Sequence, residues 1–225
     1  MSNNPQHKIV ALLAASYSGN ASTAEHRNYF AGVIAARIEK HDGAIFESSG
    51  GEAVAEFEET ADAVNCAIDI QSKLAEYNKI HPDAGQAEVR LGVHYGELFS
   101  SENKIIGSGI EVARGLLAIV PPSKIYITRE GFRRVRSVLQ LKTETLGMRS
   151  LLHNAELVEI FSVLWESVQA DMETSLKRLE RDDFHRTAIT GAPAEPHSPR
   201  RKKLPMMIFV IIVVAFLVLR YFHVL

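Results

Sequence analysis

The chain has 225 residues, 46% hydrophobic and 23% charged, which describes a globular domain with a further segment attached and excludes a mainly disordered chain. Its 25 lysines and arginines against 27 aspartates and glutamates give a net charge of -2, so we expect no nucleic-acid partner. The single cysteine, Cys66, cannot form a disulfide within the chain, and no Cys/His cluster has zinc-ligand spacing. These features favour a reducing compartment, with Cys66 as a small buried hydrophobe rather than a nucleophile.

Residues 8–15 form a short apolar run that is typical of a buried strand. Lys8, this run and Ser16 together also resemble a short signal peptide. Cleavage after the run would place the basic cluster 200–203 on the non-cytoplasmic side of the C-terminal anchor described below, against the positive-inside rule. We therefore favour the strand.

Caps and turns mark the next elements. A capping box from Ser22 to Glu25 predicts the start of a helix that runs to about Lys40 and ends at Gly43. Gly50, Gly51 and Glu52 predict a tight hairpin between two strand-like runs. Apolar residues then recur at helical spacing over 63–77, which predicts a second long helix.

The whole domain combines strand and helix signals in a fixed order. The predicted elements are strand 8–15, helix 22–40, strands 44–49 and 53–58, helix 63–77, strands 88–96, 97–100 and 104–106, helix 108–119, strand 124–128, helix 130–138, and strands 141–146 and 157–164. This order predicts an α+β fold, with a ferredoxin-like or palm-type, mainly antiparallel sheet and helices on one face.

The C-terminal end has the composition of a membrane anchor. From Met206 to Leu225 the chain is almost wholly apolar and long enough as one helix to cross a bilayer, with Arg220 near the far interface. The basic cluster 200–203 precedes it and predicts that everything before it is cytoplasmic. We therefore expect a tail-anchored, single-pass membrane protein.

Three segments precede this anchor: a domain over 1–166, a helical stalk over 167–186 and a Pro-rich basic linker over 187–205. Trp165, Val168, Met172 and Leu179 recur at heptad-like spacing, although Ser175 and Asp182 interrupt the seam. The stalk is either a coiled coil or a solitary amphipathic helix.

Four segments carry a resemblance to a known family. They are 43–57 (GAIFESSGGEAVAEF), 63–71 (AVNCAIDIQ), 91–97 (LGVHYGE) and 106–113 (IGSGIEVA). In order and spacing this series resembles the class III adenylate/guanylate cyclase homology domain. The resemblance implies the palm-type fold and a nucleotide site built across a head-to-tail homodimer.

In that family, two aspartates hold the two divalent metals that activate the reacting hydroxyl, because hard ions need carboxylate oxygens. By the resemblance, the first aspartate falls on Ser16 and the second on Gly51, and neither residue supplies a carboxylate. Glu52 is a candidate substitute after a one-residue shift of the hairpin. We expect no metal cofactor, unless the chain is an active cyclase, which would use Mg²⁺ or Mn²⁺.

The other site positions differ as well. The purine-reading pair falls on Glu47 and Lys104, which have exchanged polarity and could form an ion pair or retain some guanine recognition. The transition-state Asn and Arg fall on Glu111 and Gly115, with Arg114 one position away. His94 matches a family strand position, and we expect it to be a core or site-wall histidine rather than a base.

These substitutions predict a membrane-tethered, dimeric cyclase-homology domain that has lost catalysis and acts as a regulatory or interaction module. The alternatives are an active adenylate/guanylate cyclase making cAMP or cGMP, and a sensor that binds nucleotide without turnover. Gly50-Gly51-Glu52 also suggests a GGDEF diguanylate cyclase, but apart from Asn20 and Asn28, residues 12–29 lack the Asp and Asn residues that such an enzyme needs.

Overall fold

The apolar run near the N-terminus forms the long strand β1 (Gln6–Tyr17) in a computed structural model that describes residues 6–19, 24–101, 104–151, 157–167 and 174. The other strands are β2 (Ala44–Ser49), β3 (Glu52–Phe57), β4 (Val89–Ser101), β5 (Lys104–Ile106), β6 (Ile125–Thr128), β7 (Thr143–Ser150) and β8 (Leu157–Val163). The helices are α1 (Ala24–Lys40), α2 (Thr60–Ile80), α3 (Ser108–Ile119) and α4 (Arg129–Val135). The predicted α+β fold and its order of elements are confirmed.

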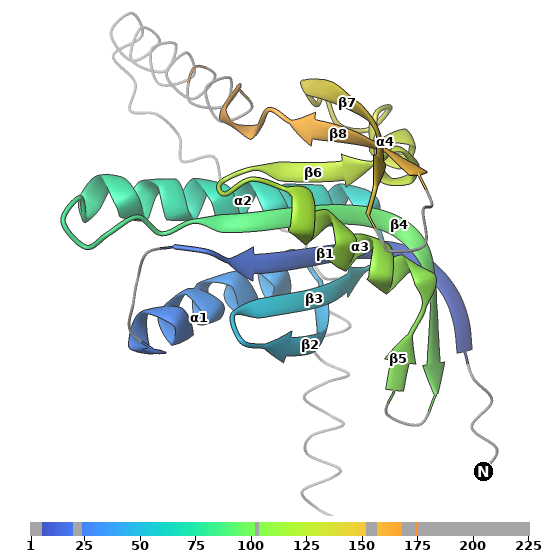
Figure 1. Cartoon of the computed structure of the whole chain (residues 1–225), viewed down its shortest axis with the longest axis horizontal. Coiled ribbons are helices and arrows are strands. Elements are labelled where there is room, and N and C mark those ends of the chain that lie inside the picture. Colours follow the sequence, from blue (N-terminus) through green and yellow to red (C-terminus); the bar gives the residue numbers. More distant parts are fainter. Residues whose placement is uncertain (1–5, 20–23, 102–103, 152–156, 168–173, 175–225) are drawn as a thin grey trace, which may run out of the picture. The chain divides into compact units, whose positions relative to one another are not determined.

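The strands form one sheet in the order β2-β3-β1-β4-β6-β8-β7, with β5 paired to β4 (Figure 1). All pairs are antiparallel except β4 with β6, which are parallel. The two predicted strands 88–96 and 97–100 are one continuous strand, β4.

Helices cover both faces of this sheet, so the expectation of helices on one face is wrong. Ala11 and Leu13 of β1 pack into a core with residues of α1, α2 and α4. Leu12 and Ala14 point to the other face and pack against α3, which lies in front of the sheet in Figure 1. Because side chains alternate along a strand, a β1 run that is apolar at every position must be buried on both faces.

Two turns show why the chain reverses where it does. Gly50 and Gly51 have φ values of +62° and +92° and form a two-residue turn between β2 and β3, where glycine avoids the strain of a side chain. At the end of α1, the left-handed residue is Asp42 (φ +58°) rather than the predicted Gly43. Gly43 has another role, because a Cβ at that position would lie 2.5 Å from the Phe57 ring.

Trp165 belongs to the domain and not to a stalk seam. Its side chain is buried in the core beside α2, and its indole nitrogen donates a hydrogen bond to the Ser123 carbonyl at 3.1 Å. The remaining seam residues, the linker 187–205 and the anchor segment 206–225 lie outside the described residues. Among the residues that are described, no helix is long and apolar enough to cross a membrane.

Candidate functional site

The first candidate cluster lies where β1 ends beside the β2–β3 turn. Ser16 is the register partner of Glu52, and its Oγ lies 3.3 Å from Glu52 Oε1. The Tyr17 amide donates to the Gly51 carbonyl at 2.9 Å, which holds the turn against β1. The hairpin therefore brings three of the predicted metal-site positions together, and Glu52 supplies the carboxylate among them.

The donors at this cluster do not fit a two-metal site. Two hard divalent cations need several carboxylate oxygens between them. Here Ser16 offers a hydroxyl, Gly51 has no side chain, and Glu52 offers one exposed carboxylate. Within the described ranges, no group of three histidine, cysteine, aspartate or glutamate side chains converges on a common point.

The second cluster joins β2 to α3 on the same sheet face, because Glu47 is the register partner of Val54, which packs with α3 residues. The carboxylate of Glu47 forms an ion pair with the guanidinium of Arg114. Both side chains are almost half exposed, at 49% and 41%, so the pair contributes at most about 1 kcal/mol to stability. The pair matters for ligand binding rather than for stability, because Glu47, at a purine-reading position, already has a partner within the chain.

The resemblance paired Glu47 with Lys104, whose side chain lies outside the described part of the structure, so that pairing stays a prediction. The partner that the structure shows for Glu47 is Arg114. Lys104 begins β5, whose backbone pairs with the end of β4. From the sequence, Arg114 was singled out only because it lies one residue before Gly115, the position of the family's transition-state arginine. Nothing in the sequence pointed to a contact between Arg114 and Glu47.

Gly115 faces a neighbour that leaves no room for a side chain. A Cβ at Gly115 would lie 2.9 Å from Leu151 Cβ and 3.0 Å from the Leu151 carbonyl oxygen. Contacts this short require the backbone after β7 to move. Glu111, one turn earlier on α3, is exposed and brings a negative charge to the position of the family asparagine. The α3 helix therefore offers neither of the transition-state groups that the resemblance implies.

His94 is a buried histidine of β4, as predicted. Its Nδ1 lies 2.9 Å from Thr128 Oγ1, and the Gly131 amide donates to the same oxygen at 3.4 Å. Thr128 is the N-cap of α4, so this contact ties the helix start to the centre of the sheet. Burial lowers the pKa of His94 to about 4, against a smaller opposing effect of the Glu130 carboxylate. Sequence reasoning gave no signal for Thr128 as the partner.

Solved structures of nucleotide cyclases share this fold. An adenylate/guanylate cyclase/hydrolase from Silicibacter pomeroyi has a TM-score of 0.64 and 21% identity, covering 71% of this chain and 98% of that one. The adenylyl cyclase CyaB from P. aeruginosa gives 0.63 and 16%, covering 72% and 96%. The guanylate cyclase domain of RhGC from Catenaria anguillulae gives 0.58 and 12%, covering 70% and 97%. The chain therefore has the fold of the class III adenylate/guanylate cyclase domains.

Similarity to curated proteins is confined to part of each. "Putative adenylate cyclase 3" of Rhizobium meliloti (strain 1021) is 28% identical over 88 residues, which cover 39% of this chain and 15% of that protein. "Serine/threonine-protein kinase pkn2" of Myxococcus xanthus is 21% identical over 124 residues, or 55% of this chain and 15% of that protein. No protein-family model matches the chain.

Proposed function

We propose that this chain is a regulatory or interaction module of signal transduction, built on a cyclase fold that no longer cyclises nucleotides. The observation that carries the proposal is the pairing of Ser16 with Glu52. This pair supplies one carboxylate, whereas the family's metal site uses two. Removing a group that stabilises the transition state typically costs about 3 kcal/mol, and a lost metal removes its whole charge. A residual cyclase activity would have to overcome several such losses.

Two further contacts support this proposal. Glu47 is paired with Arg114, so a purine read by Glu47 would have to displace a guanidinium group. Leu151 occupies the space that an arginine at position 115 would need. In a head-to-tail dimer each site takes its metal half from one chain and its transition-state half from the other. This chain supplies neither half, so a heterologous partner would not restore a complete site.

We also propose that the domain is a homodimer held at the cytoplasmic face of a membrane by the segment from Met206 to Leu225. The resemblance to a family that builds its site across a dimer supports the homodimer, as do exposed apolar side chains on β2, β4 and β5: Ile45, Phe99 and Ile106. The anchor follows from the apolar run and the basic cluster before it. Sedimentation of residues 1–174 as a monomer at micromolar concentration would contradict the dimer.

The test is a cyclase assay on the full chain in detergent or in bilayers. The protein is incubated with ATP or GTP and Mn²⁺, and cyclic product is measured by mass spectrometry. We expect no product above a protein-free control. Product that disappears in Glu52→Ala but persists in the control Glu58→Ala, which removes an exposed carboxylate just after β3, would establish the active-cyclase alternative. Thermal stabilisation by nucleotide without product would instead identify a sensor.

A further inference from the structure

A stripe of arginines follows α4, on the sheet face opposite α3. Arg129 and Arg133 lie on the helix, Arg136 is its C-cap residue in helical conformation, and the intervals of four and three residues place all three exposed side chains on one side. Two other residues fix α4 to the domain: Val135 is buried, and the Phe132 ring stacks on Phe161 at 4.6 Å. The arginine side of α4 therefore has a fixed orientation.

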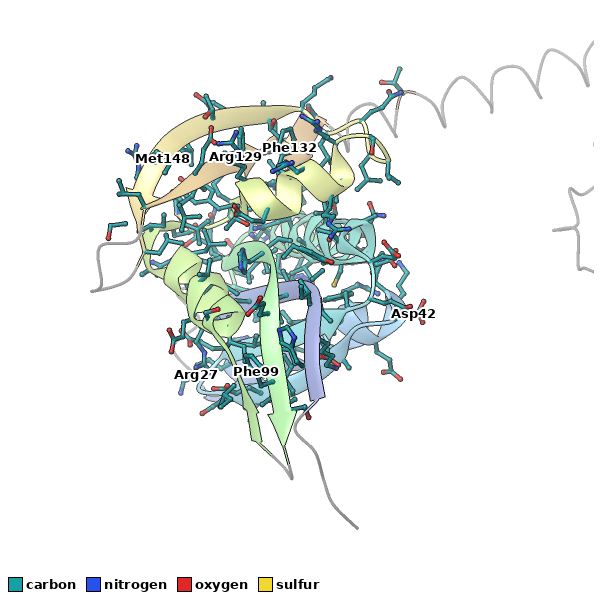
Figure 2. All side chains as sticks on the ribbon, turned by 90° about the vertical axis from the view of Figure 1, so that its right-hand side faces the viewer. Arg27, Asp42, Phe99, Arg129, Phe132 and Met148 are labelled. Atoms are coloured by element: carbon teal, nitrogen blue, oxygen red, sulfur yellow. The ribbon has the colours of Figure 1, made fainter. Side chains whose placement is uncertain are left out.

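Exposed apolar side chains flank this stripe. Arg129 pairs with Glu159 of β8 at 2.8 Å, and Glu159 is the register partner of Met148 on β7. Met148 is 50% exposed, and Leu157, two residues before Glu159 on the same face, is 57% exposed. Figure 2 shows Met148, Arg129 and Phe132 along the same side of the domain. We call this set of Arg129, Arg133, Arg136, Met148 and Leu157 the arginine surface.

Few acidic groups offset the charge of this surface. Glu159 is already paired with Arg129, and Glu144 lies on the other face of β7, opposite Ser162. Glu130 precedes Arg133 by three residues and Arg134 by four, and no ion pair joins it to either of them in the part of the chain that the structure describes; Arg134 covers the Tyr95 ring. Among the described residues, no carboxylate is paired with Arg133 or Arg136. Two guanidinium groups are therefore available to phosphate oxygens.

We infer that the arginine surface docks the domain on an anionic lipid bilayer. Guanidinium groups bind phosphate in a two-pronged geometry, and isolated apolar side chains beside them can enter the headgroup region. This combination complements anionic lipid better than a nucleic acid, for which the surface offers no exposed aromatic ring. The inference goes beyond the proposed anchor. That anchor would keep the domain close to the bilayer and raise the effective lipid concentration at the surface.

Docking through the arginine surface would hold the domain against the membrane, whereas a domain attached only through a linker would change its orientation freely. Docking would leave α3 and the Glu47–Arg114 pair on the opposite face of the sheet, available to a protein partner. Since electrostatic attraction dominates, binding should weaken at high salt and in neutral lipid.

The test uses residues 1–174, which form a compact unit containing all three hydrophobic clusters. Sedimentation with phosphatidylcholine vesicles, with and without phosphatidylglycerol, gives the partition coefficient. We expect binding only with the anionic lipid, and a loss of about 30-fold in Arg133→Gln/Arg136→Gln, on the scale of known contributions per basic residue. Met148→Ser should weaken binding with little change in its salt dependence. The control Arg27→Gln/Lys79→Gln removes two exposed charges from α1 and α2 and should keep most of the binding.

Equal binding to neutral vesicles, or equal loss in the control variant, would overturn the inference. So would binding to a soluble acidic polypeptide but not to vesicles, which would identify a protein-docking surface. The anchor is tested separately by alkaline extraction of the full chain from membranes. An extractable full chain with a lipid-binding domain would refute the anchor alone. An anchored full chain whose α4 gains no hydrogen-exchange protection in anionic nanodiscs would refute the docking alone.

Discussion

The carboxylate of Glu47 on β2 and the guanidinium of Arg114 on α3 form an ion pair that links the β2–β3 hairpin to the helix above it. In the cyclase resemblance these residues lie at or beside positions that contact nucleotide. In this chain they contact each other instead. The charge at this purine-reading position is therefore balanced within the chain.

Exchanging the two charges should preserve the pair. Glu47→Arg alone places two guanidinium groups together, so we expect a loss of up to about 1 kcal/mol in the free energy of unfolding, measured by urea titration. Glu47→Arg/Arg114→Glu should recover most of that loss. A double variant no more stable than the sum of its single variants would show that the two side chains are not coupled in solution.

Restoring an arginine to α3 should damage the fold rather than repair a site. Gly115→Ala already places a methyl group against Leu151, and we expect a loss of about 1–3 kcal/mol from overpacking. Gly32→Ala is the matched control, because that helical glycine has no atom within 4 Å of the added carbon. It should stabilise the protein by about 0.5–1 kcal/mol. Similar effects of the two changes on the unfolding midpoint would contradict the tight contact at Gly115.

The sequence predicted the elements better than their contacts. Helix bounds of 108–119 were predicted correctly, because Pro121 ends the helix and its apolar spacing is regular. The face that α3 covers was predicted wrongly, although the unbroken apolar run of β1 contained the needed signal. The Glu47–Arg114 and Gly115–Leu151 contacts join segments far apart in the chain. Such contacts depend on how β7 and α3 pack, and neither spacing nor residue type specifies that.

Acid should destabilise the domain through His94. The pKa of His94 is about 4 in the fold, below the usual value of 6.5, because burial disfavours the charged ring. The unfolded chain therefore binds a proton first, and stability falls as the pH drops from about 6.5 towards 4, by up to about 3 kcal/mol. Urea titrations across this range should show the loss. His94→Gln should flatten that part of the profile, whereas the same change at the exposed His81 should not.

Cys66 should report on unfolding because it is the single thiol of the chain. Its side chain is fully buried on α2, and burial raises the pKa of the thiol to about 12, with a smaller effect from the Asp69 carboxylate. The reactive thiolate is therefore scarce as well as inaccessible. We expect Ellman's reagent to label the protein only at the rate of unfolding, and to label it at once in denaturant. Rapid labelling of the folded protein would contradict the buried position.

A carboxylate placed at Ser16 should create affinity for metal. Ser16→Asp would stand opposite Glu52 in the β1–β3 register, and repulsion between the two charges should cost up to about 1 kcal/mol without metal. With Mn²⁺ the two carboxylates can share an ion, so the melting temperature should rise with metal concentration in the variant but not in the wild type. Ser16→Asn, which adds similar bulk without charge, should show no such rise. Equal Mn²⁺ stabilisation of the wild type would mean that Glu52 already suffices to bind metal, and the proposed loss of catalysis would then have to depend on the Glu47–Arg114 pair and Gly115 alone.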